Sequence, residues 1–423
     1  MNTLVVSSHF EDAETVISAI GRENIIFSLS SFWMWNAGGF WERVEDRYIK
    51  QLVQETVVKD KITSSYVSSI LEIIKSMVYR KDHKFDEKQK TINCKNGELL
   101  LEDGKWVLHD HCREHYRTSQ IPVYYDADAQ APRFEKFLDE IFEYDEDKED
   151  KKLLIAEMLG YCLIPSTEFE KFFILTGPGA NGKSRLLRVI EELLGQNNVS
   201  SVDPKEFSNR FQVAYLQCKM ANIITELSIG HKTSDGQLKA IASGELITAE
   251  YKHQPPFQFR PTCKVFCGTN HPPVFKDNSN GLYRRAVIIS FNRVFQESEQ
   301  DKKLDEKLAN ELPGILNIAL RGLKKLLEDG YFIEPQSCKD AKLALQLRND
   351  HVARFIFENC IKEPGLKVSI SVLHDAYRKW SISQGIISLR NKNDFSRDVV
   401  NEGAEHCKGT GGERMIAGIA LKP

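Results

Sequence analysis

The stretch Phe172-Phe-Ile-Leu-Thr176-Gly177-Pro-Gly-Ala-Asn-Gly182-Lys183-Ser184 decides the fold of this chain. Its first five residues form a short apolar run suited to a buried strand, and the next eight match the pattern G-x-x-x-x-G-K-S. After Ser184, apolar residues recur at helical spacing as far as Leu194, and Gly195 stands where a C-terminal helix cap belongs. A strand, a glycine-rich loop and a helix in this order predict a phosphate-binding loop in an α/β core.

The predicted loop has a defined chemistry. Successive backbone N–H groups and the N-terminus of the following helix would surround the phosphates, because both favour anions. We expect Lys183 to reach the β- and γ-phosphates and the Ser184 hydroxyl to ligate Mg²⁺, so the expected cofactors are ATP and Mg²⁺. The predicted ATP-binding residues are Gly177, Pro178, Gly179, Ala180, Asn181, Gly182, Lys183 and Ser184. A glycine-rich turn with an incidental lysine is the alternative.

The composition is that of a folded protein of two or three domains, with 423 residues, 41% of them hydrophobic and 28% charged. The net charge of −3 argues against a wholly basic nucleic-acid coat, so any DNA contact must come from local basic clusters. No segment reaches the ~18 apolar residues of a membrane span. Nine scattered cysteines are typical of a reducing compartment. We therefore expect a cytoplasmic protein without a membrane partner.

Residues 1–135 are predicted to form a small α+β module. The aromatic cluster at residues 32–41 reads as a hairpin with core-packed rings, or alternatively as a stacking platform for bases. Helical periodicity follows at Ile49–Val57 and Val67–Val78, and alternating residues cover Leu99–Val107. Residues 135–152 end in a charge run typical of a solvated helix end or a linker, so the first domain boundary is placed there.

Four potential metal ligands lie within seven residues of this module, namely His109, His111, Cys112 and His115. Structural zinc sites normally draw pairs of ligands from two separated knuckles, and so compact a set gives poor tetrahedral geometry. The sequence therefore does not favour a metal site here, although it leaves the question open.

Downstream of the loop, further segments share an order and spacing that is more specific than any one of them. They are Lys219–Glu226, Leu238–Lys252, Lys264–Pro273 and Gly281–Arg285, supported by Tyr124–Asp126, Gly160–Tyr161 and Glu311–Leu316. With the loop itself, they resemble the superfamily-3 helicases, in particular the C-terminal motor of phage and plasmid primases and the poxvirus-type primase-helicases. The resemblance covers about residues 90–345 and implies an AAA+ P-loop NTPase core at residues 136–345.

The resemblance also implies roles for single residues. Glu226 would orient or deprotonate the attacking water, and Asn270 would hold that water or the γ-phosphate. Arg284 or Arg285 would be an arginine finger that reaches the nucleotide of a neighbouring subunit. Thr225 departs from the pattern, because many ATPases carry a second acid there. Taken singly, each of these residues also fits a surface or turn position.

Residues 250–255 lie between two strand-like runs and are a candidate hairpin tip. The resemblance places such a tip in a central channel, where Lys252 and His253 would contact single-stranded DNA; an exposed loop with an incidental lysine is the alternative. A finger that acts on the next subunit requires a closed head-to-tail ring. Six subunits and 3′ to 5′ translocation are family expectations.

Residues 346–423 are predicted to form a winged-helix domain. Three short helices at residues 350–358, 372–380 and 395–400 precede a turn at 409–412 and a strand at 415–421. Arg390, Lys392 and Arg397 are candidate DNA contacts, with subunit packing as the alternative.

Together with the phosphate-binding loop, the resemblance implies an ATP-dependent, ring-forming DNA helicase for replication of a phage, a plasmid or another mobile element, which we expect to act in the cytoplasm of a bacterial host. Two other classes stay open, namely an AAA+ ATPase that remodels proteins and an origin-binding initiator without unwinding activity. The expected partners are single-stranded and forked DNA and further copies of the chain. No primase centre is evident, so we expect primers to come from a separate primase or polymerase.

Overall fold

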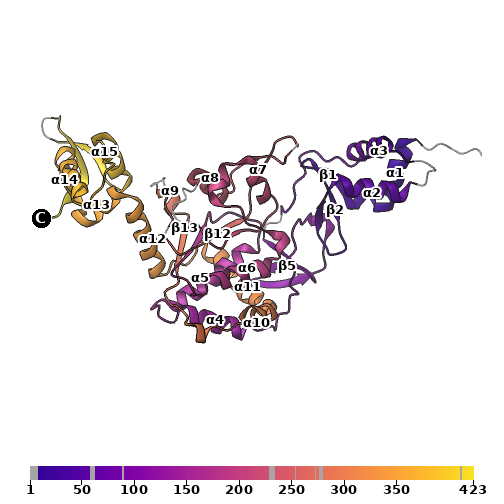
Figure 1. Cartoon of the computed structure of the whole chain (residues 1–423), viewed down its shortest axis with the longest axis horizontal. Helices are drawn as coiled ribbons and strands as arrows, with labels where there is room; N and C mark the ends of the chain where they lie inside the picture. The colour runs from indigo at the N-terminus through magenta and orange to yellow at the C-terminus, as the bar shows by residue number, and fades with distance from the viewer. Residues whose placement is uncertain are drawn as a thin grey trace, which may run out of the picture.

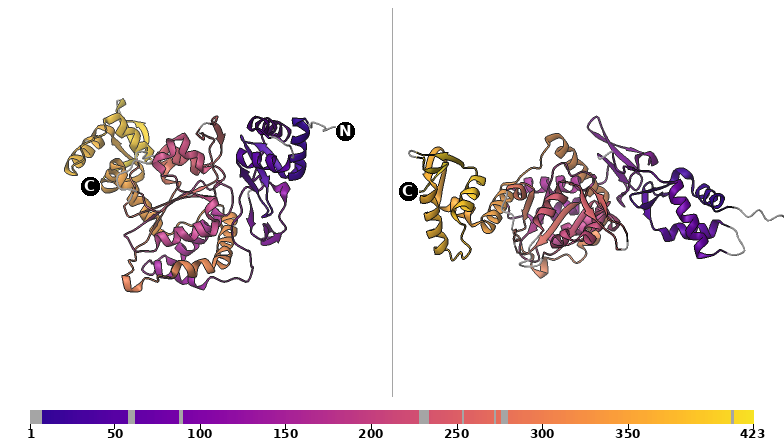
Figure 2. Two further views of the ribbon diagram at one scale, coloured as in Figure 1. Left: turned by 45° about the vertical axis from the view of Figure 1, so that its right-hand side comes forward. Right: turned by 90° about the horizontal axis from the view of Figure 1, so that it is seen from above.

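The computed structural model describes residues 8–57, 62–87, 90–227, 234–252, 254–271, 273–275, 280–409 and 412–423. These residues form three bodies in a row, with an α/β core between an N-terminal module and a C-terminal domain (Figure 1 and Figure 2). Within the described part of the chain, no helix has both the length and the apolar character needed to cross a bilayer.

The N-terminal module packs three helices against a three-stranded antiparallel sheet in the order β1-β2-β3. Its elements are α1 (His9–Ile20), β1 (Ile25–Ser28), β2 (Ser31–Trp35), β3 (Trp41–Val44), α2 (Asp46–Thr56) and α3 (Ser64–Met77). The two expected helices and the aromatic hairpin are confirmed. Trp33 and Trp41 are 2% and 0% exposed, so these rings pack in the interior and are not available to stack on bases.

A second antiparallel sheet joins this module to the core. Its strands are β4 (Thr91–Cys94), β5 (Gly97–Glu102) and β6 (Lys105–His109). Ile92, Cys94 and Leu99 belong to the same buried cluster as the helices of the α/β core. In addition, Trp106 Nε1 donates a hydrogen bond of 3.0 Å to the carbonyl of Leu320 in helix α11 (Leu312–Asp329). This sheet therefore shares its interior with the core.

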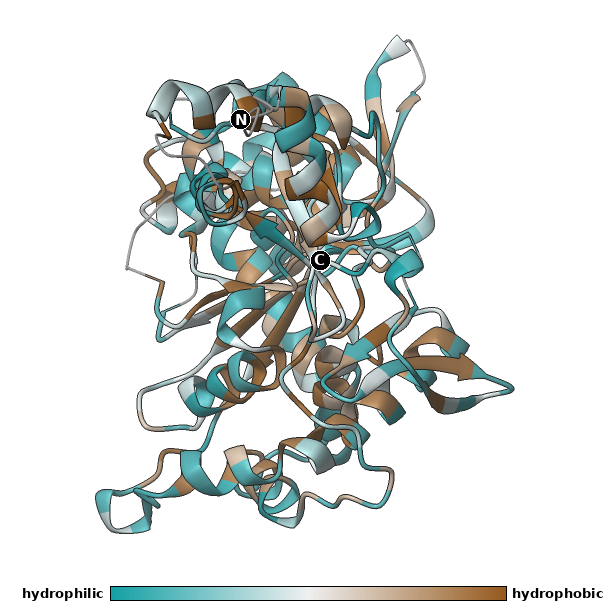
Figure 3. Ribbon diagram, turned by 90° about the vertical axis from the view of Figure 1, so that its right-hand side faces the viewer, coloured by the Kyte–Doolittle hydropathy of each residue, from teal (hydrophilic) through white to brown (hydrophobic). Residues whose placement is uncertain are grey.

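The core is built on a parallel sheet of five strands in the order β13-β7-β12-β9-β8. The strands are β7 (Phe172–Thr176), β8 (Val199–Ser200), β9 (Ala221–Ile224), β12 (Lys264–Thr269) and β13 (Ala286–Ser290). Parallel sheets are covered by helices on both faces, which explains why β7, β9 and β12 are nearly continuous apolar runs. In Figure 3 these central strands are mostly apolar, while polar residues lie on the outer helices. The expected α/β core is confirmed.

Helices α4 (Pro132–Ile141), α5 (Lys148–Cys162), α6 (Lys183–Leu194) and α10 (Leu304–Asn310) pack with α11 in the buried cluster on one face of this sheet, the face that carries Phe173 and Leu175. Helices α5 and α11 are in direct backbone contact at two glycines. A Cβ on Gly160 would lie 2.4 Å from the Ala319 carbonyl oxygen, and a Cβ on Gly322 would lie 2.2 Å from the Ala156 carbonyl oxygen. The charged residues that were expected to form a solvated helix end or linker include the first turn of α5. Lys151 in its first turn is fully buried and pairs with Asp145 at 3.0 Å.

A small antiparallel hairpin projects from the core. Its strands β10 (Ile247–Ala249) and β11 (Phe257–Phe259) pair in register, as the sequence predicts. Helix α7 (Arg210–Val213) packs against β10, and α8 (Asp235–Ala242) and α9 (Asn280–Tyr283) lie nearby. Helix α7 lies on the side of the core nearer the N-terminal module (Figure 1).

Helix α12 (Gln336–Asn349) leads to the C-terminal domain. This domain contains α13 (His351–Asn359), β14 (Cys360–Ser369), α14 (Ile370–Ser383), α15 (Lys392–Asn401), β15 (Glu405–Lys408) and β16 (Arg414–Leu421), with the antiparallel strand order β14-β16-β15. The three helices and the last strand were expected, whereas β14 was not. Phe355, Tyr377 and Phe395 form the centre of its own buried cluster.

Candidate nucleotide-binding site

The glycine-rich loop connects the end of β7 to the start of α6, as the sequence predicts. Gly177 has φ +152°, and Gly182, the N-cap of α6, has φ +91°, a region that favours glycine. A Cβ on Gly182 would lie 2.6 Å from Ile141 Cγ2, and one on Gly177 would lie 2.3 Å from the Phe291 carbonyl oxygen. Both positions therefore need glycine for conformation and for space.

The ammonium of Lys183 lies at the centre of the loop. Its Nζ donates hydrogen bonds to the carbonyls of Gly177 (2.7 Å) and Pro178 (3.0 Å), to Asn181 Oδ1 (3.0 Å) and to Asn270 Oδ1 (3.1 Å). Burial lowers the pKa of Lys183, and the Glu226 carboxylate partly offsets that shift. A cation held by neutral acceptors beside one carboxylate suits an incoming anion.

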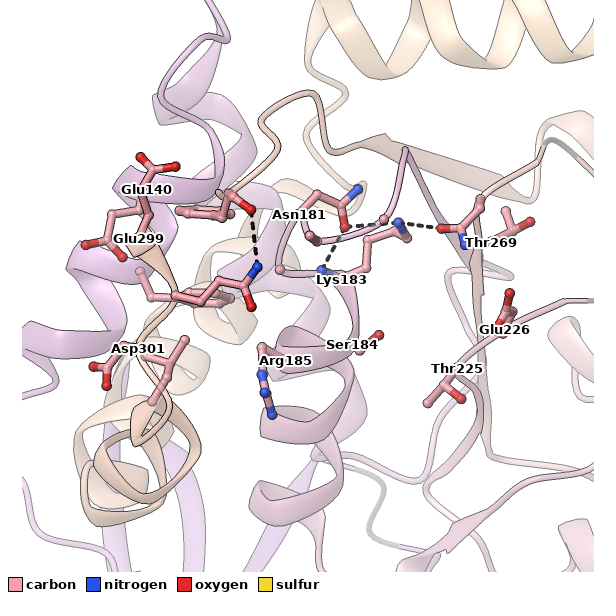
Figure 4. Close-up of a pocket in the computed structure, with 18 of the residues that line it drawn as sticks. Glu140, Asn181, Lys183, Ser184, Arg185, Thr225, Glu226, Thr269, Glu299 and Asp301 are labelled. Carbon is pink, nitrogen blue, oxygen red and sulfur yellow. Dashed lines mark hydrogen bonds between the residues drawn. The ribbon is translucent and has the colours of Figure 1, made fainter. Parts of the chain in front are cut away.

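Strand order explains how residues far apart in sequence meet at this loop. Strand β12 lies between β7 and β9, so Asn270 after β12 and Glu226 after β9 come to the edge of the sheet from which the loop departs. Gly177 N–H donates to the Thr269 carbonyl at 3.3 Å, which ties the loop to β12. Figure 4 shows Lys183, Ser184, Thr225 and Glu226 around one space. Of the five residues assigned to catalysis from the sequence, the fold brings together Lys183, Glu226 and Asn270.

These residues line one side of a cavity of about 300 Å³, a size that suits a small-molecule ligand. The residues on the opposite side of this cavity were not predicted from the sequence. That side is lined by Arg133, Phe137, Glu140, Phe295, Glu299, Gln300, Asp301 and Leu304. Phe295 N–H donates to the Ala180 carbonyl at 2.8 Å, which fixes this wall to the loop. No local motif marks these residues, because α4 and the segment after β13 reach the loop only through the tertiary fold.

The side chains present fit a magnesium ion of the kind that accompanies a nucleotide. Ser184 and Thr225 supply hydroxyl groups and Glu226 a carboxylate on the loop side of the cavity (Figure 4). Such Mg²⁺ ions take few protein ligands and keep waters and phosphate oxygens. Among the described residues, no group of three or more His, Cys, Asp or Glu side chains is arranged to hold a metal ion.

Arg284 and Arg285 lie at the other edge of the sheet. Strand β13 is parallel to β7, with Ala286 opposite Phe172 and Ser290 opposite Thr176. The arginines precede β13 whereas the loop follows β7, so the length of the strand, roughly 15 Å, separates them from the loop of their own chain. The fold therefore does not bring them to this cavity.

The two arginines differ in their surroundings. The Arg285 side chain is 10% exposed and donates to Ser243 Oγ (2.8 Å) and to the Gly281 carbonyl (2.7 Å), besides an ion pair with Glu170 at 2.8 Å. The Arg284 side chain is 66% exposed and lies 3.6 Å from Glu170. Arg285 is thus bound within its own chain, whereas most of the Arg284 side chain is exposed to solvent.

The predicted DNA-contacting residues lie apart from the cavity. Lys252 is exposed at the hairpin tip, and His253 lies outside the described residues. In the C-terminal domain, Arg390 pairs with Asp398 at 2.9 Å and Arg397 with Asp394 at 2.7 Å. Lys392 Nζ donates to Ser371 Oγ. A phosphate would have to replace these partners.

The four candidate metal ligands of the first module turn to different partners. His109 Nε2 pairs with Glu102 at 2.9 Å, and His115 Nδ1 with Glu98 at 2.7 Å. His111 Nε2 lies 2.9 Å from the Cys94 carbonyl oxygen, and Cys112 Sγ lies 3.5 Å from Glu114. The four side chains do not converge on one point.

Comparisons with known proteins agree with this architecture. Residues 13–143 match the family described as D5 N terminal like, and residues 175–285 match a family of unknown function (DUF5906). The chain is similar to the putative helicase L207/L206 of Acanthamoeba polyphaga mimivirus, with 24% identity over 372 residues, which cover 81% of this chain and 38% of that protein. It is also similar to the putative helicase 121R of Invertebrate iridescent virus 3, with 24% identity over 265 residues, covering 54% and 28%.

The chain thus spans less than two fifths of these viral relatives. Among solved structures, the apo A form of the C-terminal region of NrS-1 shares the fold, with a TM-score of 0.54 and 12% identity over 96% of this chain and 99% of that one. The chain therefore has an α/β NTPase-like core and a likeness to viral putative helicases.

Proposed function

We propose that the chain is the ATP-driven motor of a DNA replication helicase, an AAA+ ATPase of the superfamily-3 kind. The observation that carries this proposal is the convergence on one cavity of Lys183 at the start of α6, Asn270 after β12 and Glu226 after β9, beside a glycine-rich loop. The likeness to viral putative helicases supports unwinding as the work that hydrolysis drives.

In this proposal each residue has one task in ATP hydrolysis. The backbone of residues 177–184 and the ammonium of Lys183 bind the phosphates. Glu226 orients the attacking water and accepts its proton, and the Asn270 amide holds that water or the γ-phosphate. Bound Mg²⁺, ligated by Ser184, would neutralise charge on the phosphates. The base would lie against Phe137 and Phe295 at the far wall.

In this proposal, hydrolysis also draws on positive charge from a neighbouring copy. Because Arg284 is exposed at the opposite edge of the sheet, it is suited to act on the nucleotide of a neighbouring copy. Repetition of this contact generates a closed head-to-tail ring, for which six subunits and 3′ to 5′ movement on single-stranded DNA are proposed from the family resemblance. Arg285 supports Arg284 from within the subunit.

We infer that DNA contacts come from the hairpin and from the C-terminal domain. Lys252, with the neighbouring His253, would neutralise backbone phosphates in the ring channel. The C-terminal domain, proposed to be a winged helix, would add Arg390, Lys392 and Arg397 once DNA displaces their present partners. We also propose that a separate primase or polymerase supplies the primers and that the chain serves the replication of a mobile element.

A strand-displacement assay on a tailed duplex, with and without ATP, tests the proposal and separates its rivals. The helicase unwinds only with ATP, and Lys183→Ala abolishes unwinding. A protein-remodelling ATPase would hydrolyse ATP without stimulation by single-stranded DNA. An origin-binding initiator would bind duplex DNA sequence-specifically even with Lys183 replaced.

A further inference from the structure

An exposed tyrosine stands beside the hairpin. Tyr215 lies in the short 3₁₀ turn Ala214–Leu216, directly after α7. Its neighbours Ala214 and Leu216 are fully buried, whereas Tyr215 is 59% exposed. The turn is held in place, since the Tyr251 hydroxyl in the hairpin donates to the Ala214 carbonyl at 3.0 Å. A large ring is therefore presented to solvent on a fixed backbone.

The contrast with Tyr251 shows which ring can accept a ligand. Tyr251 stacks on Phe257 at 5.3 Å between centroids, and the Arg43 guanidinium of the N-terminal module lies 4.4 Å from its centroid. Tyr215 meets Tyr251 at 6.4 Å with the two planes 87° apart. With this contact in place Tyr215 is still 59% exposed, so solvent reaches much of its ring.

The surroundings of Tyr215 are basic as well as aromatic. Arg210, in the preceding helix, has a side chain 58% exposed and pairs with Glu250 at 3.0 Å. Lys252 is exposed at the adjacent hairpin tip. The Tyr251 ring also lines a groove of about 750 Å³ between the hairpin and the N-terminal module, whose charged residues are Arg43, Glu45, Asp46, Arg47 and Lys75. Tyr251 therefore connects this groove with Tyr215, whose ring it contacts.

We propose that Tyr215 is a base-stacking residue for single-stranded DNA that runs along the hairpin, with Arg210 and Lys252 against the phosphates. The inference rests on the proposed helicase function and adds to it a contact with the bases. Every base has a π-face, so stacking tolerates any sequence, as a motor that moves along DNA requires.

The test is binding of a fluorescent oligo-dT by the full chain, followed by anisotropy, with variants at position 215. Stacking contributes about 1 to 3 kcal/mol per base, so Tyr215→Ala should weaken binding roughly 5- to 150-fold while Tyr215→Phe stays within about twofold of wild type. The matched control is Tyr124→Ala, which removes another tyrosine, 56% exposed and with Lys95 Nζ 5.1 Å from its ring centroid, in a different part of the chain. This control should bind as wild type does.

Two further measurements separate stacking from charge. Binding affinity plotted against salt concentration on logarithmic axes gives a slope that reports the number of counterions released. Tyr215→Ala should leave this slope unchanged, whereas Lys252→Ala should lower it by about one counterion. On an oligonucleotide of abasic sites, wild type and Tyr215→Ala should bind equally. Equal binding of both proteins to oligo-dT would overturn the role of Tyr215 alone, and failure of the wild type to bind any single strand would overturn the helicase proposal with it.

Discussion

Lys183 and Asn270 meet at the nucleotide site, where the lysine Nζ donates a hydrogen bond of 3.1 Å to the asparagine Oδ1. The two residues are 87 positions apart: Lys183 begins α6, after the loop that follows β7, and Asn270 follows the adjacent strand β12. This contact joins the lysine proposed to bind the phosphates to the residue proposed to hold the γ-phosphate or the water. It also makes the site sensitive to the charge at position 270.

Replacement of Asn270 therefore has two distinct expected results. Asn270→Ala removes a polar group at the reacting phosphate and should lower kcat for ATP by about 100-fold with little loss of nucleotide binding. Asn270→Asp places a carboxylate beside Lys183 and against the phosphates, so it should also weaken ATP binding. Steady-state hydrolysis and titration with a fluorescent ATP analogue distinguish the two variants. Unchanged kcat in Asn270→Ala would remove this residue from the mechanism.

The two arginines before β13 should separate into a functional and a structural residue. Arg284→Ala should abolish ATP hydrolysis, with a loss of about 10³-fold or more, and leave the unfolding temperature unchanged. Arg285→Ala should lower the free energy of unfolding by about 2 kcal/mol, because Ser243 and the Gly281 carbonyl lose their partner. Thermal unfolding and ATPase assays on both proteins test this. If the Arg284→Ala protein is stable and active, Arg284 is not the arginine finger.

The stability of the core should depend on pH through Glu157. This side chain is fully buried in α5, and burial raises its pKa to about 7. The carboxylate also accepts a hydrogen bond of 2.9 Å from the Ile333 N–H, which lowers the pKa and so opposes part of this shift. Because the folded protein holds this proton more tightly than the unfolded chain, stability is complete below about pH 4.5 and falls as the pH rises to about 7.

Glu157→Gln keeps the acceptor for Ile333 and cannot ionise. At pH 8 it should exceed wild type by about 3 kcal/mol in the free energy of unfolding, and the two proteins should converge below about pH 4.5. Denaturant unfolding across this range measures the difference. Parallel pH profiles would show that Glu157 is not the titrating group.

The backbone contact between α5 and α11 should not tolerate a methyl group. Gly322→Ala would force a Cβ to within 2.2 Å of the Ala156 carbonyl, so the helices must separate, at a cost of about 3 kcal/mol. Gly236→Ala is the matched control, because it also lies in a helix but faces open space. It should be neutral or slightly stabilising. Equal effects of both substitutions would contradict the proposed close packing.

The sequence predicted best where the physical signal is local. The strand, loop and helix around Lys183 follow from a motif and its flanking periodicity, and the hairpin at residues 246–259 follows from two short apolar runs. The wall formed by Arg133, Phe137 and Phe295 could not be predicted, because only the tertiary fold brings it to the loop. Lys151 resembles its charged neighbours in sequence, and its burial depends on Asp145 and the Ser290 carbonyl.

Strand β14 shows a second limit of local reasoning. It contains Pro364 and Gly365, which usually mark a turn, and its pairing with β16 shifts register between Lys362 and Lys367. The strand exists because β16 supplies a partner on either side of the irregularity. Long-range pairing of this kind leaves no periodic signal in the strand itself.

The central claim is that the loop of one copy and Arg284 of the next form a single hydrolytic site. Mixing the inactive proteins Lys183→Ala and Arg284→Ala tests it most directly, because a ring containing both places an intact Arg284 beside an intact loop at some interfaces. We predict that the mixture recovers ATP hydrolysis, reaching up to about a quarter of the wild-type rate if subunits mix at random and each such site works independently. Hydrolysis that stays absent in a mixture shown to assemble, or an Arg284→Ala protein that is fully active alone, would contradict the claim.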